Sequence, residues 1–358
     1  HIEKQTADKL DASVGDLVAM RYFERAYDYL LALCEECESA DLVIASHHYM
    51  YPAIRHVYRG PVIYESHNVE ADMKCAVLGV ASDYIKEAQA CLERFESYDP
   101  KSAEEWLAYN QAVERWCAKG AVLVTACSEA DATRLQSLYS IKPGSIEIVP
   151  NGVDMGGLLF AEREERERYQ SRQLMQHNMT AVFMGSWHGP NLEAAEAILD
   201  IARQMEQQGN AQWQFWMMGS VCHYWQDCLR DGRLDALPSN VRLLGMLSET
   251  EKAVVLASAD LALNPMLAGS GSNLKMMEYT AAGIPVLSTP FGNRGLEYRD
   301  KSEIIECELS QFVPYLLARN GDSDMPNILS ARELTQDVYR WENIAQKYSN
   351  FLLALLRT

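Results

Sequence analysis

The chain has 358 residues, of which 48% are apolar and 23% charged, and its formal net charge is −18. These are ordinary values for a globular protein, and the length exceeds what one hydrophobic core usually organises, so two domains are expected. The acidic balance argues against nucleic acid as a partner and against bulk attraction to an anionic membrane, although a local basic patch would escape this argument. No apolar run of about 18 residues is present, so no membrane-spanning helix is expected.

The N-terminal stretch and the cysteines bear on where the protein works. HIEKQTADKLDASVGD lacks the apolar core of a signal peptide and an initiating Met, so we interpret the chain as a fragment or a processed form. Nine scattered cysteines favour reduced thiols, and hence a cytoplasmic protein. Cys34 and Cys37 would suit half a zinc site or a redox pair, but their amphipathic segment favours ordinary helix cysteines.

The first half of the chain alternates apolar runs with amphipathic stretches. The expected elements are, in chain order, a helix at 16–39, strands at 42–45 and 61–64, a helical region at 70–118, a strand, loop and helix within 120–139, and a strand leading to a turn at 150–152. Ser128 is the expected N-cap of the last helix.

The second half repeats this order. We expect strands at 180–186, 213–220, 240–247, 260–265 and 283–290, helices at 191–205, 248–259 and 273–282, and a long terminal helix at 334–356. Ser248 and Glu251 have the spacing of a capping box. Alternating apolar strands and helices predict an α/β fold with parallel sheets in two Rossmann-like domains, 1–150 and 151–330, and a C-terminal helix at 331–358 packing back on the first. Ligands bind at the carboxyl ends of parallel strands, so we expect the site in a cleft between the two sheets.

The stretch GSGSNLKMMEYTAAG, which begins at Gly269, holds an unusually placed lysine. The pattern predicts a helix that ends before Gly283, with Leu274, Met277 and Ala281 facing the core. Lys275 then lies in the first helical turn, where the helix dipole disfavours a positive charge.

Two interpretations of this lysine remain open. Lys275 and Glu278 could form an intrahelical salt bridge worth about 0.2–0.5 kcal/mol, in the less favourable order along the helix. Alternatively, the free amides of the first turn, the close approach that Gly269 and Gly271 allow, and the lysine could together bind a phosphate or diphosphate. Glu278 would then suit the hydroxyls of a sugar.

GSGSNLKMMEYTAAGIPVLSTPFGNRGL also resembles the donor-binding motif of family 4 glycosyltransferases, which have the GT-B fold. The resemblance extends through IEIVPNGVD, VFMGSWHGPN and VRLLGMLSE to the terminal helix with Trp341, and so covers most of residues 40–358. It implies a retaining enzyme that moves a sugar from a nucleotide-diphosphate sugar to a glycan or other hydroxyl acceptor, without a metal or cofactor. The first domain would then face the acceptor and the second would bind the donor.

The resemblance also implies site residues. Glu278 matches the glutamate that binds the ribose, and His67 matches a histidine near the transferred sugar; with Lys275 these are the expected catalytic residues. The loop that contacts the donor sugar and phosphates matches Ser270, Gly271, Ser272, Asn273 and Leu274. Gly185 and Ser186 match the loop near the diphosphate, and Gly245 and Met246 match the wall of the base pocket.

Three positions depart from the family pattern. A glutamate often found eight residues before the second one is here Ser270. The usual arginine and lysine pair is missing from GSWHGPNLEAAEA, which leaves Lys275, His188 or Arg294 to take over its role. The glycine-rich loop that normally follows the first strand is not found before residue 40, so the first domain is interpreted as truncated at its start.

Other candidate groups have plainer interpretations. His67 is either a hydrogen-bonded loop residue or a site residue; its place after a strand supports the site, and both interpretations remain open. His47 and His48 are interpreted as loop residues, and no metal cluster is expected there. The acidic pair around Ser323, Asp322 and Asp324, is interpreted as a solvated turn rather than a metal site.

The expected function is therefore glycosyl transfer in surface polysaccharide or glycoconjugate assembly, in the cytoplasm or at the inner face of the membrane through peripheral contact. An epimerase of the same fold and a non-catalytic nucleotide-sugar-binding protein are the alternatives. A pyridine-dinucleotide oxidoreductase is disfavoured, because no GxGxxG motif follows a strand.

Overall fold

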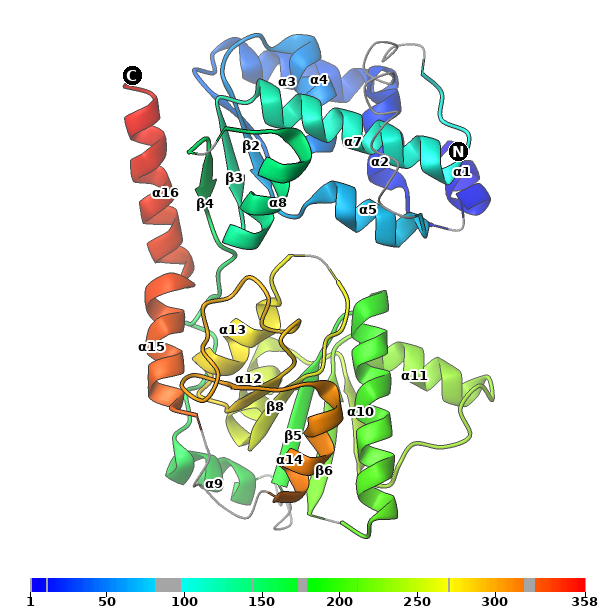
Figure 1. The fold of residues 1–358 in the computed structure, drawn as a ribbon, viewed down its shortest axis with the longest axis vertical. Helices are drawn as coiled ribbons and strands as arrows, with labels where there is room; N and C mark the ends of the chain where they lie inside the picture. The colour runs from blue at the N-terminus through cyan, green and yellow to red at the C-terminus, as the bar shows by residue number, and fades with distance from the viewer. Residues whose placement is uncertain are drawn as a thin grey trace. The chain divides into compact units, whose positions relative to one another are not determined.

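The computed structural model describes residues 2–10, 12–80, 98–142, 144–172, 179–210, 212–269, 271–318 and 326–357. The chain forms two compact units, one made of residues 1–150 with 348–358 and the other of residues 151–347. Each unit has its own parallel sheet with helices packed on it, as Figure 1 shows. The expected α/β class with parallel sheets is therefore confirmed.

The first unit has a parallel sheet in the simple order β1-β2-β3-β4. Its strands are β1 (Val43–Ala45), β2 (Val62–Ser66), β3 (Leu123–Ala126) and β4 (Ile146–Ile148). Its helices are α1 (Ile2–Leu10), α2 (Gly15–Tyr22), α3 (Tyr27–Glu38), α4 (Tyr51–Val57), α5 (Glu70–Leu78), α7 (Ala103–Gly120) and α8 (Glu129–Tyr139), with short 3-10 turns η1 (Phe23–Arg25) and η2 (His48–Met50). Ser128 caps α8 as predicted, because its hydroxyl accepts from the Asp131 amide at 3.1 Å.

The expected helix at 16–39 is divided into α2 and α3 by the turn η1. Leu17 and Met20 of α2 pack in a core with α7, whereas Cys37 of α3 packs in a second core with α4 and the sheet. A straight helix would not serve both cores, so the single-helix prediction is wrong. The helical region expected at 70–118 contains α5 and α7, and residues 81–97 lie outside the described part.

The second unit has a parallel sheet in the order β10-β9-β8-β5-β6-β7. Its strands are β5 (Met179–Met184), β6 (Trp213–Met218), β7 (Val241–Gly245), β8 (Leu261–Asn264), β9 (Val286–Ser288) and β10 (Ile305–Glu306). Its helices are α9 (Arg163–Arg172), α10 (Gly189–Gln207), α11 (Val221–Arg230), α12 (Glu249–Ser258), α13 (Leu274–Ala281), α14 (Phe312–Ala318), α15 (Ile328–Val338) and the start of α16 (Trp341–Leu355), with a 3-10 turn η4 (Leu309–Gln311). Buried side chains of α10, α11 and α14 form one core against the sheet, and those of α12 and α13 form another. The capping box of Ser248 and Glu251 at α12 is confirmed.

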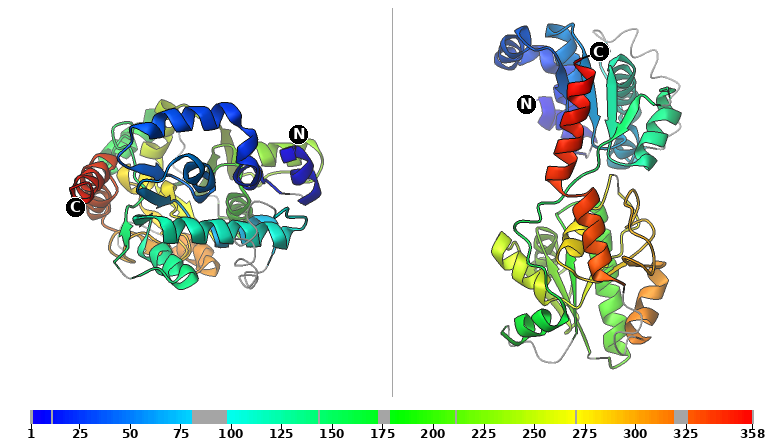
Figure 2. Two further views of the ribbon diagram at one scale, coloured as in Figure 1. Left: turned by 90° about the horizontal axis from the view of Figure 1, so that it is seen from above. Right: turned by 90° about the vertical axis from the view of Figure 1, so that its left-hand side faces the viewer.

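The single helix expected at 334–356 is two helices, α15 and α16, which Figure 2 shows as separate elements. Between them, Arg340 pairs with Val153 in an isolated parallel bridge, in which the Val153 amide donates to the Tyr339 carbonyl at 2.7 Å. This long-range pairing takes precedence over the local helical pattern. The last part of α16, from Tyr348 onwards, belongs to the first unit.

Candidate functional site

Three glycines end neighbouring strands of the second unit and are joined by backbone hydrogen bonds. The Gly185 amide donates to the Met218 carbonyl at 3.0 Å, and the Gly219 amide donates to the Gly245 carbonyl at 2.8 Å. Gly219 has φ +97°, and a Cβ on it would lie 2.3 Å from the Gly185 carbonyl oxygen, so only glycine fits this position. The loops after β5 and β6 are therefore held close together at the carboxyl edge of the sheet.

A pocket of about 290 Å³ opens at this edge, between the loops after β5 and β8 and the start of α13. Its lining includes seven of the residues expected from the sequence: Gly185, Ser186, Ser272, Asn273, Leu274, Lys275 and Glu278. His188 and Arg294 also line it, so all three candidates for the missing basic pair meet in one pocket. A volume of this size accommodates part of a nucleotide-sized ligand.

Lys275 is the most unusual group of the pocket. Its side chain is 8% exposed, and its Nζ donates to Asn191 Oδ1 at 2.7 Å and lies 4.5 Å from the centre of the Phe183 ring. Among the described residues, no carboxylate lies within ion-pair distance of it. Burial lowers the pKa of Lys275 to about 7, because desolvation penalises the charged form. The pocket thus contains a buried amine that an anionic ligand would keep protonated.

The first turn of α13 also has the features of an anion-binding site. Asn273 occupies the N-cap position, but its side chain makes no capping bond and instead donates to the Gly292 carbonyl at 2.8 Å. Within the described part of the chain, no side chain caps this helix end. Amides at the start of a helix that lack a side-chain acceptor form a ready site for an anion.

Glu278 does not pair with Lys275, so the intrahelical salt bridge is not formed. Its carboxylate forms an ion pair with Lys252 of α12, with Lys252 Nζ 2.9 Å from Glu278 Oε2. Lys252 also contacts Glu249, at 2.7 Å. Burial opposes the charge of Lys252, but its hydrogen bonds to the two carboxylates outweigh this and raise its pKa.

The glycine-rich loop before α13 is supported by Arg294. Its guanidinium donates to the carbonyl of Gly269 at 3.1 Å and to that of Gly271 at 2.5 Å. Ser270, between these glycines, lies outside the described residues. Gly271 is not part of the pocket lining, although its neighbours Gly269 and Ser272 are.

The remaining predicted residues of this unit lie apart from the pocket or differ in burial. Gly245 ends β7 and Met246 is 65% exposed after it; neither is part of the pocket lining. Leu274 is 50% exposed at the pocket, so its predicted place in the core is wrong, whereas Met277 and Ala281 are buried. Leu274 begins the helix, where the chain has not yet turned its apolar side towards the sheet.

His67 follows β2 in the first unit and stacks on His47, which follows β1. Their ring centres lie 4.6 Å apart at an angle of 26°. The burial of its ring, followed by the effect of the neighbouring His47, lowers the pKa of His67. The other face of His47 stacks on Tyr49, at 4.9 Å. The structure thus places two of the three histidines of these loops against each other, which the sequence pattern did not predict.

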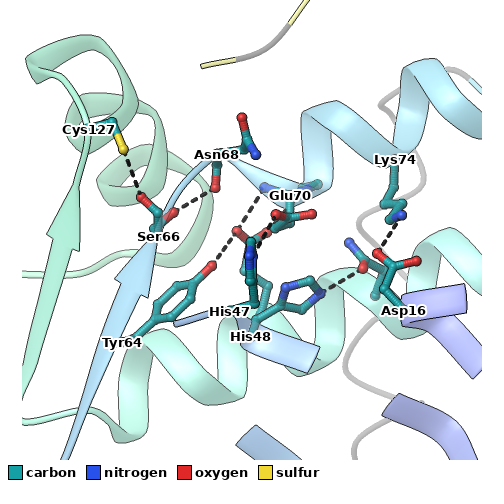
Figure 3. Close-up of polar contacts among 12 residues, drawn as sticks. Asp16, His47, His48, Tyr64, Ser66, Asn68, Glu70, Lys74 and Cys127 are labelled. Carbon is teal, nitrogen blue, oxygen red and sulfur yellow. Dashed lines mark hydrogen bonds and ion pairs between the residues drawn. The ribbon is translucent and has the colours of Figure 1, made fainter. Parts of the chain in front are cut away.

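Buried polar groups lie next to His47, and Figure 3 shows Glu70 and His48 beside it. Glu70 is 2% exposed, and its Oε1 lies 3.7 Å from His47 Nδ1. Burial opposes its charge, but the contact with His47, together with His48 and Lys74, outweighs this and lowers the pKa of Glu70. His48 is fully buried and its Nε2 lies 2.7 Å from Asn110 Oδ1.

Glu114 of α7 fixes the start of α5 from within the core. Its carboxylate accepts from the Glu70 amide at 3.0 Å, the Ala71 amide at 2.9 Å and the hydroxyls of Tyr64 and Tyr139 at 3.1 and 2.5 Å. Burial raises the pKa of this carboxyl. A carboxylate at the first amides of a helix also interacts favourably with the helix dipole.

Sequence reasoning missed Asn191, Lys252, His47 and Glu70. Asn191 and Lys252 each contact a predicted residue, but they lie far from it in the sequence, so no local pattern connects them. No local pattern marked His47 and Glu70 either, because they come together only through β1 and β2, the preceding strands, which are neighbours in the sheet.

The cysteine and metal candidates give no site in the described chain. Cys34 is exposed and Cys37 buried on α3, both as free thiols. Asp322, Ser323 and Asp324 lie outside the described residues. No group of three or more His, Cys, Asp or Glu side chains in the described ranges is arranged to bind a metal ion.

Comparison with known proteins identifies the class. A family model described as Glycosyltransferase Family 4 matches residues 17–156, and one described as Glycosyl transferases group 1 matches residues 178–307. The chain belongs to glycosyltransferase family 4. In this glycosyltransferase the first match lies in the N-terminal half and the second in the C-terminal half. No curated protein sequence matches it.

Solved structures share its GT-B fold. HepE of Anabaena in complex with UDP and glucose matches with a TM-score of 0.65 at 14% identity, over 94% of this chain and 84% of HepE. Sucrose-phosphate synthase from Thermosynechococcus elongatus matches with a TM-score of 0.69 at 15% identity, over 94% and 79% of the two chains. Starch synthase IV from Arabidopsis thaliana, bound to ADP and acarbose, gives 0.58 at 14% identity, over 96% and 78%. No helix in the described part of the glycosyltransferase is both long and apolar enough to cross a membrane.

Proposed function

We propose that this glycosyltransferase binds a nucleotide-diphosphate sugar in the pocket at the start of α13 and transfers the sugar with retention of anomeric configuration. The acceptor is a hydroxyl of a glycan or glycolipid, and the setting is surface polysaccharide or glycoconjugate assembly. We place the reaction in the cytoplasm, with peripheral contact to the inner face of the membrane. Neither a metal ion nor a cofactor is required.

The observation that carries the proposal is the buried amine of Lys275. It lies at the uncapped start of α13 with an amide oxygen as its partner and no carboxylate in the described surroundings. A diphosphate bound there would supply the missing negative charge and accept from the first-turn amides. Arg294 and His188, on the rim of the same pocket, would add positive charge or hydrogen-bond donors.

Glu278 and the neighbouring loops account for the remainder of the donor. Glu278 lies one helical turn beyond Lys275 in the pocket lining, which suits a carboxylate that accepts from ribose hydroxyls. Gly185 and Ser186 line the pocket and would contact the diphosphate. The predicted loop residues Ser270, Gly271, Ser272, Asn273 and Leu274 would contact the sugar and its phosphates. Gly245 and Met246, outside the pocket, would form the wall of the nucleobase site.

His67 is the proposed contact of the first unit to the transferred sugar. Its lowered pKa favours the neutral imidazole, which has one donor and one acceptor nitrogen for sugar hydroxyls. In the proposed reaction the bond between the anomeric carbon and the diphosphate oxygen breaks, and the acceptor oxygen bonds to the anomeric carbon on the same face. The proton of the acceptor passes to an oxygen of the departing diphosphate, whose charge Lys275 and the helix amides stabilise.

Membership in the family and the ligands of similar structures support a transferase. HepE is known with UDP-glucose and starch synthase IV with ADP, and both share only the fold with this chain. An epimerase would instead release free sugar, and a non-catalytic partner would bind nucleotide without turnover.

Thermal unfolding with a panel of nucleoside diphosphates tests the donor site. A bound nucleotide at a hundred times its dissociation constant should add about 2.7 kcal/mol to the free energy of unfolding. Lys275→Ala should lose most of this effect, whereas Lys347→Ala, which changes an exposed lysine of α16, should keep it. The absence of a shift with every nucleotide would overturn the donor site.

Product analysis tests the reaction. Incubation with a labelled donor and an acceptor panel should give a glycoside whose anomeric proton coupling in NMR matches that of the donor. An inverted coupling would overturn the retaining mechanism, and free epimerised sugar without glycoside would overturn transfer itself.

A further inference from the structure

Outside the donor pocket, the first unit contains a column of three stacked rings. Tyr49, His47 and His67 stack in this order, with centroid distances of 4.9 and 4.6 Å and interplanar angles of 14° and 26°. His67 is the most exposed of the three residues. The residues come from two loops that follow neighbouring strands, β1 and β2.

The middle ring is held in place by a buried carboxylate. Glu70 Oε1 lies 3.7 Å from His47 Nδ1, and the Glu70 amide is bound by the buried Glu114. The second oxygen of Glu70 is buried and has no hydrogen-bond partner among the described residues. The side-chain contact of Glu70 is therefore His47, while His48 and Lys74 also favour its charge. The nearest further charges along α5 and α2 are Lys74 and Asp16, which pair with each other at 2.5 Å.

We infer that His47 is a positioning residue for His67: its ring, clamped by Glu70 and Tyr49, fixes the imidazole that contacts the transferred sugar. This inference rests on the proposed function of His67. An imidazole on an exposed loop has two free side-chain torsions, and stacking on a clamped ring removes most of that freedom before substrate binds. Misplacement of a catalytic contact by about 1 Å can cost about a hundredfold in rate.

The stack also sets the electrostatic surroundings of His67. The groups that face it are His47, which disfavours its protonation, and Glu65 and Glu70, which favour it. Of these, Glu65 is bound by the Ser46 hydroxyl at 2.9 Å, and Glu70 is occupied by His47. Replacing His47 therefore changes both the orientation of His67 and its titration.

Two substitutions separate these effects. His47→Phe keeps a ring in the stack but loses the contact with Glu70, and His47→Ala removes both. His56→Ala is the matched control, because it removes an exposed histidine of α4 outside the stack. Thermal unfolding of each variant checks that the protein is folded, and the measurements are kcat, donor KM and the titration of His67 by histidine side-chain NMR without substrate.

We expect His47→Ala to lower kcat about 10- to 100-fold with donor KM within about threefold, and to raise the pKa of His67 towards its ordinary value. His47→Phe should also raise the pKa of His67. Its fold-loss in kcat should be less than about a third of that of His47→Ala, because the ring remains in the stack. His56→Ala should change neither quantity.

The NMR titration distinguishes this inference from the proposed function, since it needs no turnover. An unchanged His67 titration and unchanged kcat in a folded His47→Ala enzyme would overturn the inference alone. Full activity of His67→Ala would overturn the role of His67, and the positioning role of His47 with it.

Discussion

Lys252 Nζ of α12 lies 2.9 Å from Glu278 Oε2 of α13, so a lysine already holds the carboxylate that we propose binds the ribose. Lys252 connects Glu278 to Glu249, whose side chain is far more exposed. Two helices that follow different strands are therefore joined through a residue that lines the pocket. The ion pair involves one carboxylate oxygen of Glu278, a residue that also lines the pocket.

Lys252→Met should weaken donor binding through this connection. Without the ammonium, Glu278 loses its orienting partner, and donor KM should rise about fivefold, equivalent to about 1 kcal/mol, with a smaller change in kcat. Steady-state kinetics with varied donor measure this change. Glu249→Gln, which removes the exposed partner of Lys252, is the control and should alter KM less than twofold, roughly the size expected for a surface pair. An unchanged KM in Lys252→Met would show that the connection has no role in donor binding.

Lys275→Met should stabilise the nucleotide-free enzyme while abolishing its response to nucleotide. The folded-state pKa of about 7 lies below the ordinary value of 10.5, so the unfolded chain binds the proton more tightly between these values. The folded enzyme consequently loses stability as pH falls from 10.5 to 7, and the loss is complete below 7. The variant escapes this cost, and its free energy of unfolding at pH 7 should exceed that of the wild type by about 1–3 kcal/mol.

Urea unfolding at pH 7 and pH 10 measures the difference, which should shrink at the higher pH. A variant that is less stable than the wild type at both values would contradict a destabilising burial of the amine without a carboxylate partner. Calorimetry at pH 8 in two buffers of different ionisation enthalpy should show that wild-type enzyme takes up protons when it binds a nucleoside diphosphate, and that Lys275→Met does not.

Asn191→Asp should impair the donor site by giving Lys275 a counter-charge of its own. The amide oxygen of Asn191 accepts from Lys275 at 2.7 Å, and its Nδ2 donates to the carbonyl and hydroxyl oxygens of Ser186 at 3.2 and 3.1 Å. A carboxylate there would raise the pKa of Lys275 and repel the diphosphate, so affinity should fall at least about tenfold.

Calorimetric titration with a nucleoside diphosphate measures the loss in Asn191→Asp, and its proton uptake at pH 8 should disappear because the lysine is already charged. Asn191→Ala is the companion variant: it removes the contact without adding charge and should retain proton uptake. Wild-type affinity in Asn191→Asp would exclude a diphosphate next to this side chain.

Glu303→Gln should lower the free energy of unfolding of the second unit at neutral pH, by removing a contribution that depends on the ionised carboxylate. Glu303 is 2% exposed and accepts from Arg299 and from the hydroxyls of Ser302 and Ser330, at 3.0 and 3.2 Å. Chiefly through its hydrogen bond with Arg299, the pKa of Glu303 is lowered to about 2. This contribution is present above the ordinary pKa of 4.5 and is lost as pH falls towards 2.

The wild type should therefore exceed Glu303→Gln in stability by about 1–3 kcal/mol at pH 7, and this difference should shrink below pH 4.5 and be nearly lost at about pH 2. Thermal unfolding across this range gives the comparison, with the exposed Glu308→Gln as the control. Equal stability at pH 7 would indicate that the surrounding donors bind the amide as well as the carboxylate.

Local patterns in the sequence were sufficient for the fold class, the N-cap at Ser128, the capping box at Ser248 and the unusual position of Lys275. They were insufficient where a distant residue decides the outcome. Val153 interrupts the terminal helix, and the partners of Lys275 and Glu278 come from α10 and α12. The ring stack of His47 and His67 depends on two loops meeting at a sheet edge, which only the strand order determines.

The close contact between Gly219 and the Gly185 carbonyl has a practical consequence for altering this enzyme. Gly219 lies next to the pocket but is not part of its lining. A mutant library that varies all residues near the pocket would therefore include Gly219 with its neighbours. Its positive φ and the 2.3 Å approach nevertheless forbid a side chain whichever sugar the donor carries. Libraries aimed at a new donor should therefore vary Ser186 and His188 and keep Gly219 constant, because its restriction comes from the adjoining strand.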